Sequence, residues 1–486
     1  MNTRSIVART DNTRFSTLWD SYLLPLGLPL LLGAGLALLL AKLIVNESLL
    51  FVLPVALLVP MAILIVRYPF VAIIIWMAVM PWFPFQGIYR YVYFTVHRCL
   101  IPLALGISIL SRILRLKKHE PVHLGPASLA MVAFGAMGIV SIFAHRNHWK
   151  TLFTLQDQFL VPFTAYWLVR FSNAQKQDLK RLLPLMLLIN LAEYAIGLVS
   201  WFIPQALPSI WQSRLIGNRT VGTFGQPAVY ACVLILFFVL FYHDAMNRPK
   251  GSMRTLQILA FGLGVVCIFF TFTRGAWLAG ILVLLGLLYL YPKPTASLVS
   301  VVIPIMLILS AGPLAGEFAY AAERLESTEE GSEARLVLAN AGKQMFQARP
   351  AFGWGFDTYD RYDRRFLERV GGISPTPWQI KYGTSHHTYL TILAEMGAVG
   401  FLFYALPVIW WLVFTIKALP RLPKEGFWSW RLLVAMWLPI GIHIVSAQDM
   451  DMRFFPYCLT LFWINLGFIA NMVQAHLRPG NSRLTD

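Results

Sequence analysis

Long apolar runs alternate with short polar segments along the chain. Each run is about 18–25 residues long, which lets an α-helix cross a hydrocarbon core of about 30 Å. The polar start of the chain leads into a full-length run rather than the short apolar core of a cleavable signal. The pattern predicts an all-α polytopic membrane protein with about 12–14 transmembrane helices. The predicted spans lie near residues 22–44, 49–67, 69–86, 99–114, 124–144, 155–171, 182–204, 226–243, 256–272, 275–291, 296–313, 386–414, 431–447 and 454–474.

The composition agrees with a membrane protein and changes how its charge is interpreted. Of 486 residues, 57% are hydrophobic and 13% are charged, about half the charged share of a soluble domain. The net charge is +17, and basic residues gather before the first predicted span and after several even-numbered ones. They are Arg4, Arg9, Arg14, Arg112, Arg115, Lys117, Lys118, Lys176, Lys180, Arg181, Arg248, Lys250, Arg254, Lys293, Lys417, Arg421 and Lys424. A cytoplasmic N-terminus places them all on the cytoplasmic side, so membrane orientation explains the charge better than nucleic-acid binding. Anionic substrates are a second reason for it.

The same topology collects the remaining polar segments on the other side of the membrane. The largest is 314–385, and a loop of this length is more often functional than idle. This organisation predicts four parts, namely transmembrane helices 1–204, transmembrane helices with arginine turns 205–313, a large loop 314–385, and C-terminal helices with a tail 386–486. The four cysteines show no CxxC spacing, so neither a metal site nor a disulfide framework is indicated.

Two arginine-containing turns on that side are candidate anion sites. In TFTRGAWLAG, Arg274 lies between two apolar runs, where an arginine usually has a partner or a task. Gly275 beside it is expected to let the chain turn sharply. In SRLIGNRTVGTFGQPAVYA, Arg214 and Arg219 precede a turn that opens the next span, and a guanidinium beside a helix N-terminus suits a phosphate. The simpler interpretations are an interfacial anchor for Arg274 and an ordinary helix start for the other two.

Two adjacent histidines stand directly before the run that begins SHHTYLTILAEMGAVG. A histidine can act as a base near neutral pH, although the polar end of a helix explains His386 and His387 equally simply. Glu395 follows about two and a half helical turns later, inside an apolar run where a carboxylate indicates a function or an ion pair. Arg335 begins an amphipathic segment of the large loop, for which a solvated helix is the simpler interpretation.

Other polar residues near the last spans have structural interpretations. His443 is expected to be a satisfied packing residue inside its span. Asp449, Asp451 and Arg453 form a possible exterior ion-pair cluster. The sequence has no HExxH, GxSxG or P-loop motif, and no paired exterior DxD that would indicate a metal-bound nucleotide-sugar.

Taken in order, these pieces resemble the O-antigen ligase/polymerase superfamily of bacterial membrane glycosyltransferases. Four blocks between about residues 213 and 400 carry the resemblance: RTVGTFGQP, TFTRGAWL, Arg335 with the later RPAFGWGFDTY, and SHHTYLTILAEMGAVG. The second block departs from the family at Thr273, where Ser is usual, and the last departs at His387, which occupies an Asn place. The residues that fit the last block are Ser385, His386, Tyr389, Leu390, Glu395, Gly397 and Gly400.

The resemblance implies a fold of the membrane glycosyltransferase C type and a chemistry without metal or cofactor. Such enzymes transfer glycan from an undecaprenyl-diphosphate donor to an acceptor hydroxyl at the periplasmic face of the bacterial inner membrane. The resemblance assigns catalysis to His386, which would activate or orient the hydroxyl, and to Arg274 and Arg219, which would stabilise the diphosphate leaving group. It leaves open which of the two histidines acts. Lesser, substrate-binding roles fall to Arg214, Arg335, His387 and Tyr389.

The acceptor is not fixed by the resemblance. A polymerase of O-antigen or exopolysaccharide transfers to another lipid-linked repeat unit, a ligase transfers to lipid A-core, and a protein O-oligosaccharyltransferase transfers to Ser or Thr. The large loop and the number of spans favour a polymerase. The alternative from another class is a flippase for lipid-linked oligosaccharides. A flippase predicts charges within the spans around a central cavity, whereas the notable charges here gather at one face.

Overall fold

The computed structural model describes residues 63–83, 92–114, 122, 125–143, 148–212, 219–326, 330–375, 377 and 385–477. The predicted span 22–44 and most of 49–67 lie outside these residues. Contacts divide the chain into two compact units, Met1–Val71 and Ala72–Asp486. The described part of the first unit is a short helical stretch and a turn at residues 63–71, and the fold below is that of the second unit.

Every predicted span within the described residues corresponds to a helix. Among the described residues, eight helices are long and apolar enough to cross a membrane, and three shorter apolar ones accompany them. The described residues contain no β-strand, and their β pairing is the single bridge between Val370 and Ile373. The prediction of an all-α polytopic membrane protein is therefore confirmed. The long helices are Tyr93–Ile113 (η3 and α6), α10 (Lys176–Phe202), α11 (Pro227–Asn247), α12 (Ser252–Phe269), α14 (Pro292–Ser310), α19 with η9 (Thr388–Arg421), α20 (Trp430–Asp449) and α21 (Pro456–Leu477). The shorter ones are Val71–Trp82 (α4 and η2), α7 (Pro126–Ile142) and α13 (Arg274–Leu290), and the span predicted at 155–171 corresponds to α8 (His148–Leu155), η4 (Gln156–Leu160) and α9 (Val161–Phe171).

Two helices, α11 and α21, form the centre of the bundle. They are apolar on all sides, and about nine-tenths of each is buried, 94% for α11 and 89% for α21. A helix that is hydrophobic all round belongs in a core or a membrane. By contrast α14 is only 6% buried although its mean hydropathy is 1.7, as expected for a helix whose surface faces lipid.

One end of the bundle gathers basic side chains, and we call it the basic end. The Lys180 ammonium lies 5.0 Å from the centre of the Phe427 ring, and the Arg431 guanidinium lies 5.5 Å from that of Tyr291. His243, near the end of α11, lies between them, with Nε2 2.8 Å from the Phe427 carbonyl. The beginnings of α10, α12, α14 and α20 and the ends of α11, α13 and α19 therefore share this end. These helix ends and the segments next to them carry the described basic residues predicted for the cytoplasmic side, apart from Arg112, which lies in α6.

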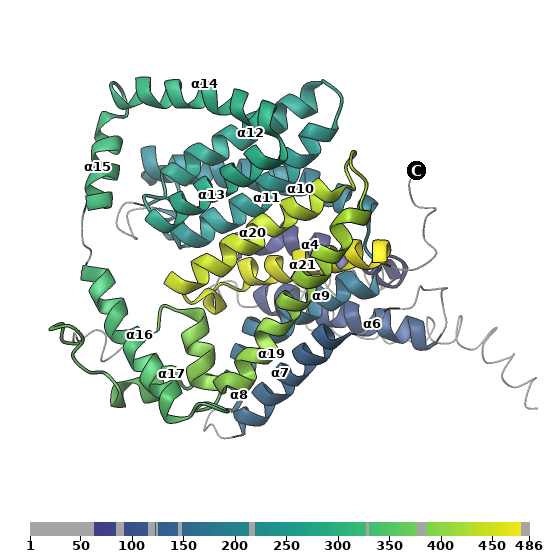
Figure 1. Cartoon of the computed structure of the whole chain (residues 1–486), viewed down its shortest axis with the longest axis vertical. Helices are drawn as coiled ribbons and strands as arrows, with labels where there is room; N and C mark the ends of the chain where they lie inside the picture. The colour runs from purple at the N-terminus through teal and green to yellow at the C-terminus, as the bar shows by residue number, and fades with distance from the viewer. Residues whose placement is uncertain are drawn as a thin grey trace, which may run out of the picture. The chain divides into compact units, whose positions relative to one another are not determined.

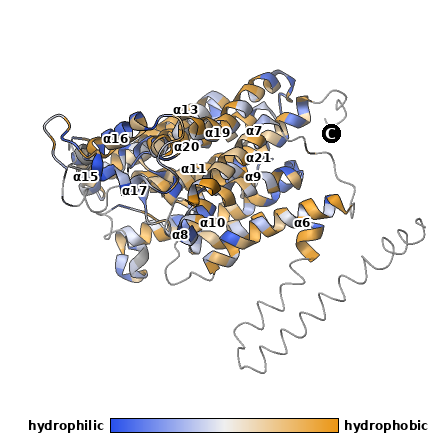
Figure 2. Cartoon of the chain, turned by 90° about the horizontal axis from the view of Figure 1, so that it is seen from below, coloured by the Kyte–Doolittle hydropathy of each residue, from blue (hydrophilic) through white to orange (hydrophobic). Residues whose placement is uncertain are grey.

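At the opposite end, α10, α12 and α20 end while α11, α13, α19 and α21 begin. The chain between α14 and α19 adds an extramembrane segment here, with α15 (Ala315–Glu326), α16 (Glu330–Ala348), α17 (Tyr359–Tyr362) and η8 (Asp363–Arg365). Figure 1 shows α15 following α14 after a turn, and α16 lying beside the start of α19. In Figure 2 the colour of α16 is largely hydrophilic, whereas that of α6 is mostly hydrophobic. The helices α15 and α16 make up most of the first half of this segment.

The amphipathic helix α16 is packed, not simply solvated. Its face Val337, Leu338, Ala341 and Met345 is fully buried, and the helix packs against α19. The expectation of a solvated helix around Arg335 was therefore wrong for one of its faces, although Arg335 itself is exposed. The helix ends at Ala348, directly before Arg349 and Pro350.

Candidate functional site

His386 lies in the turn that leads into α19, which begins at Thr388. Its φ is 49°, in the left-handed region. Non-glycine residues are uncommon there, although histidine adopts this region more often than most types. Such backbone strain persists where the surroundings impose it, and it is concentrated at functional sites. The side chain is half-buried, so the turn holds the imidazole in a defined place at the edge of the bundle.

His387 has a different role, as the N-cap of α19. Its Nδ1 accepts a hydrogen bond from the Leu390 N–H at 3.2 Å. Burial lowers the pKa of His387, which keeps this nitrogen unprotonated and able to accept. Asparagine is among the preferred N-cap residues, so the Asn usual at this place in the superfamily would satisfy the same backbone donor. The departure at His387 therefore has a local structural explanation.

Hydroxyl groups around the two histidines fix the turn. The Ser385 hydroxyl donates to the His387 carbonyl at 2.9 Å and accepts from the His387 N–H at 3.0 Å. The Thr388 hydroxyl donates to the Met450 carbonyl at 3.0 Å and accepts from the Met452 N–H at 2.9 Å. Through Thr388, the start of α19 is tied to the connection between α20 and α21.

That connection carries a buried ion-pair network. Arg453 binds Asp451 at 2.7 Å with Nη2 and Glu395 at 2.7 Å with Nη1. The second oxygen of Glu395 accepts from the backbone N–H groups of Thr358 and Tyr359, both at 3.1 Å. The predicted ion pair between Asp451 and Arg453 is confirmed, but both residues are buried rather than exterior, and the other carboxylate that binds Arg453 is Glu395 rather than Asp449. Glu395 is thus a structural partner that joins α19, the 451–453 turn and the extramembrane segment.

Gly353 and Gly397 lie in the last two sequence blocks, RPAFGWGFDTY and SHHTYLTILAEMGAVG, and allow the backbones of these blocks to approach each other. Gly397 has φ 66° and ψ −172°, so α19 is interrupted there, and the span predicted at 386–414 is not one continuous helix. A Cβ on Gly397 would collide with the Ala351 backbone, and one on Gly353 (φ 67°) would collide with that of Glu395. Backbone bonds join the two segments at this point, including Gly355 N–H to the Glu395 carbonyl at 2.7 Å. Only residues without a Cβ permit this approach.

The Arg219 turn is held in place by hydrogen bonds to the carboxylate of Glu193. The Thr223 N–H and hydroxyl donate to the two oxygens of Glu193 in α10 at 3.0 and 2.7 Å. Gly222 and Gly225 adopt positive φ, as the predicted tight turn requires. The chain then enters α11 with Pro227 in its first turn, as predicted. Arg219 itself is half-buried.

The Arg274 turn is shaped by an aromatic residue, not by Gly275. Phe272 is fully buried and has φ 43°, a genuine outlier for a bulky side chain. Arg274 and Gly275 are already the first residues of α13, so the expectation that Gly275 makes the turn was wrong. A Cβ on Gly275 would meet only the Asp449 carboxylate oxygen, at 3.8 Å. Gly275 thus lies beside the end of α20, and Arg274 is the exposed first residue of its helix.

Direct contacts bring these turns together. The Thr220 N–H donates to the Phe270 carbonyl at 3.0 Å, which joins the Arg219 turn to the Arg274 turn. Asp449 beside Gly275 brings the Arg274 turn to the end of α20, and Thr388 links that end to the His386 turn. Sites far apart in the sequence therefore form one group at the end opposite the basic end.

The electrostatics of the group are consistent with this placement. Burial lowers the pKa of Arg219, and the positive charges of Arg335 and Arg274 lower it further. Tyr320 accepts a hydrogen bond from the Arg219 guanidinium and raises this pKa. Burial also lowers the pKa of His386, and Arg335 lowers it further while Asp451 opposes. Three guanidinium groups and a neutral imidazole thus share one electrostatic neighbourhood. Like charges held together are costly, and an anion with several charges is the ligand that would relieve the cost.

A model of a known protein family matches the part of the chain that contains most of these residues. Residues 259–405 match a family model described as O-antigen ligase. Over this segment, the chain is similar to the O-antigen ligase family. The match confirms the resemblance to the O-antigen ligase/polymerase superfamily and covers Arg274, Arg335, His386 and His387. No individually curated protein matches the chain.

The remaining predicted site residues are placed differently. Arg214 lies outside the described residues. Arg219 lies before the matched segment, so its inclusion depends on the contacts of its turn. The Tyr389 hydroxyl donates to the Ile444 carbonyl at 2.9 Å, which ties α19 to α20, and its substrate-binding role stays a prediction. His443 packs on the Phe462 ring as expected, with centroids 4.6 Å apart, but its Nε2 has no hydrogen-bond partner among the described residues.

Several residues that shape the site were not singled out by the sequence. Glu193 could have been found as the carboxylate inside the predicted span 182–204, since a carboxylate within a span usually has a partner or a task. Phe272 gave no signal, because a positive φ at a phenylalanine is set by tertiary packing. The aromatic ring of Tyr320 in α15 also gave none, because its contact with Arg219 joins segments about 100 residues apart, a separation no local pattern encodes.

Proposed function

We propose that the protein transfers glycan from an undecaprenyl-diphosphate-linked donor to an acceptor hydroxyl. The observation that carries the proposal is the gathering of Arg219, Arg274 and Arg335 with His386 at one end of the bundle. The opposite end of the bundle is basic, and the positive-inside rule supports a cytoplasmic position for the basic end. We therefore propose that the site lies at the periplasmic face of the inner membrane. The membrane glycosyltransferase C type is the fold that fits this placement.

The chemistry follows from these side chains. The arginines hold the diphosphate, whose charge grows as the bond between the anomeric carbon and the phosphate oxygen breaks. The acceptor oxygen attacks that carbon from the opposite side, and neutral His386 accepts the proton of the attacking hydroxyl. The bonding electrons leave with the lipid diphosphate. His387 is occupied as a helix cap, so His386 is the histidine that we assign to this step.

Among the possible acceptors, we propose a second lipid-linked repeat unit, which makes the protein a polymerase of O-antigen or exopolysaccharide. The extramembrane segment packed on α19 supports this, because it adds surface around the site that a growing glycan can contact. Transfer to lipid A-core is the second candidate, supported by the ligase description of the family model. Charged residues inside the spans do not favour a flippase, because Arg98 is hydrogen-bonded to Asp157 at 2.7 Å and Glu193 to Thr223.

The proposal is tested with purified protein reconstituted with a lipid-linked repeat unit. We expect Arg274→Ala and His386→Asn to abolish transfer. Asparagine tolerates the left-handed backbone, so the second variant removes the base and retains the turn. Arg421→Ala at the basic end is the control and should transfer normally. Full transfer by either site variant would refute the assignment, and transfer that stops in EDTA would refute the metal-independent chemistry.

The same preparation distinguishes the acceptors. Lipid A-core and the lipid-linked repeat unit are offered together, and the products are separated by size and by lipid anchor. A ladder of lipid-linked products is expected for a polymerase. Products that appear only on lipid A-core would replace the polymerase with a ligase, and transport of the donor without any transfer would favour a flippase.

A further inference from the structure

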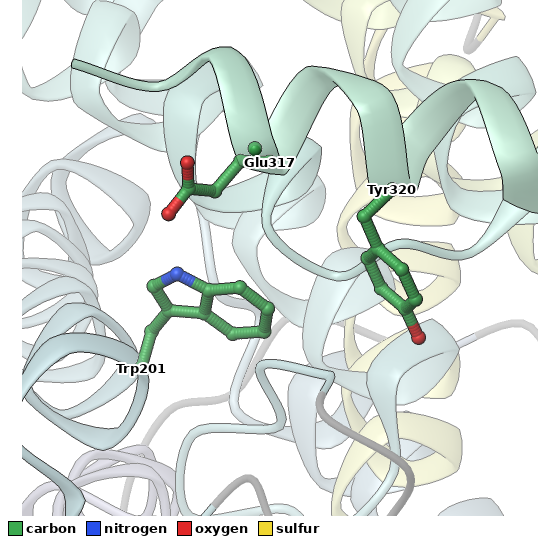
Figure 3. Close-up of a pocket in the computed structure, with 4 residues that line it drawn as sticks. Trp201, Glu317 and Tyr320 are labelled. Atoms are coloured by element: carbon green, nitrogen blue, oxygen red, sulfur yellow. The ribbon is translucent and has the colours of Figure 1, made fainter.

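We call Arg219, Arg274 and Arg335 the arginine group. A small cavity lies beside this group, between the end of α10 and the start of α15. Its volume is about 120 Å³, and it is lined by Trp201, Gly316, Glu317 and Tyr320. Figure 3 shows the Trp201 indole and the Glu317 carboxylate facing each other across it, with the Tyr320 ring at its side. No residue of this cavity has a role in the chemistry proposed above.

The cavity wall is held rigidly by aromatic packing. The Trp201 ring packs on Phe272 with centroids 4.8 Å apart, and Tyr320 meets Phe272 edge-on at 4.9 Å. Phe272 is the strained residue two positions before Arg274. The same packing that shapes the Arg274 turn therefore positions one face of the cavity, and the fixed indole is pre-organised to receive a ligand at small entropic cost.

The lining has the chemistry that recognises a sugar ring. A pyranose has an apolar face of C–H groups that packs on an indole, and an edge of hydroxyls that donate to a carboxylate. Trp201 supplies the first surface and Glu317 the second. Hydrogen bonds to a charged acceptor are the stronger ones and fix orientation. A phosphate does not fit beside Glu317, because the two negative charges would repel.

Tyr320 connects the cavity to the arginine group. Its hydroxyl accepts a hydrogen bond from Arg219, while its ring lines the cavity. A sugar in the cavity would thus lie one side chain away from the arginine group. The size of the cavity suits one ring rather than an oligosaccharide, and pockets for larger ligands exceed about 300 Å³.

We propose that Trp201, Glu317 and Tyr320 form the subsite for the donor sugar that is linked directly to the diphosphate. This inference rests on the proposed function, because the arginine group supplies the neighbouring diphosphate site. The subsite selects the first sugar of the donor. The arginines, which contact only phosphate, cannot make that selection.

Gly316 offers a sharp test, because a Cβ added there meets no atom within 4 Å. A longer side chain can therefore extend into the cavity without disturbing the fold. We would compare Gly316→Leu and Glu317→Gln with Glu323→Gln, an exposed carboxylate of the same helix. The probes are inorganic pyrophosphate and a panel of methyl glycosides of hexoses and N-acetylhexosamines, with binding to protein in nanodiscs measured by saturation-transfer NMR.

At least one glycoside should bind the wild-type protein. We expect Gly316→Leu to abolish that binding and Glu317→Gln to weaken it about tenfold, the loss of one charged hydrogen bond. Pyrophosphate binding should be unchanged in both, and Glu323→Gln should resemble the wild type. The subsite is refuted if no glycoside of the panel binds, or if the two cavity variants bind it as the wild type does. If glycoside binds but pyrophosphate does not, the subsite stands and the diphosphate site of the proposed function fails.

Discussion

The two adjacent histidines can be separated by substitutions that address one role each. His387 caps α19 by accepting from the Leu390 N–H at 3.2 Å, whereas His386 projects from a strained turn into the arginine group. We predict that His387→Asn retains full glycan transfer, His387→Ala loses part of it, and His386→Asn loses nearly all of it. The three variants differ in which hydrogen bond or proton transfer they remove.

The expected magnitudes follow from the contacts. Replacing an N-cap residue by alanine costs about 0.5–2 kcal/mol. If the whole cost falls on holding the His386 turn, transfer slows by about 2- to 30-fold, since each 1.36 kcal/mol is tenfold. Asparagine provides a side-chain oxygen for the same donor, so its cost is near zero. Removing a general base costs about 10²–10⁴-fold, well above the largest cap effect.

The assay is single-turnover transfer from the lipid-linked repeat unit, with the thermal unfolding midpoint of each variant measured in parallel. His387→Ala should lower both the midpoint and the rate, whereas His386→Asn should lower the rate alone. A His387→Asn protein that folds normally yet transfers no glycan would refute the capping explanation. It would move the proton transfer to His387.

Further variants test the buried ion-pair network around Arg453 and the pH dependence of transfer. Arg453→Met leaves two buried carboxylates, Glu395 and Asp451, without their cation, and we expect a loss of about 3–5 kcal/mol in the free energy of unfolding; an unchanged thermal midpoint would contradict the buried ion pair. Transfer should need neutral His386, so it should fall as the pH drops through a pKa held below the ordinary value of 6.5 by burial and by Arg335. Arg335→Gln removes a positive charge that opposes protonation, so the pKa rises and the acid limb of the pH–rate profile should move to higher pH; a limb that stays or moves lower would contradict this electrostatic contact.

The spans could be predicted from the sequence, and the candidate site residues could be proposed from it, because both depend on local pattern. Apolar runs long enough for a bilayer predicted each described span, and the short motifs around Arg274 and His386 indicated the family. The basic segments predicted the grouping that the bundle shows at one end, where Lys180 and Arg431 lie on aromatic rings of other segments. Each of these signals is contained within about 20 consecutive residues.

The errors concern residues whose role is decided by distant neighbours. Glycine beside Arg274 suggested a turn, yet the positive φ belongs to Phe272, which the packing of Trp201 and Tyr320 holds in place. Arg453 appeared exterior because it stands in a short polar segment, yet it is buried against Glu395, 58 positions away. No local pattern encodes such pairings, because the partner is selected by how the helices assemble.

The same distinction explains why the proposed catalytic residue and its supporting residues are interleaved in the motif at the start of α19. Ser385, His387 and Thr388 make backbone contacts that hold the turn, and Glu395 binds Arg453 further along the helix. His386 takes part in none of these four contacts, and the charges of Arg335 and Asp451 act on its imidazole. A turn that keeps a histidine at positive φ needs all of its neighbours to be fixed. The length of the motif is therefore what we expect if His386 is the proton acceptor that we propose, because its turn is positioned by contacts with other parts of the chain.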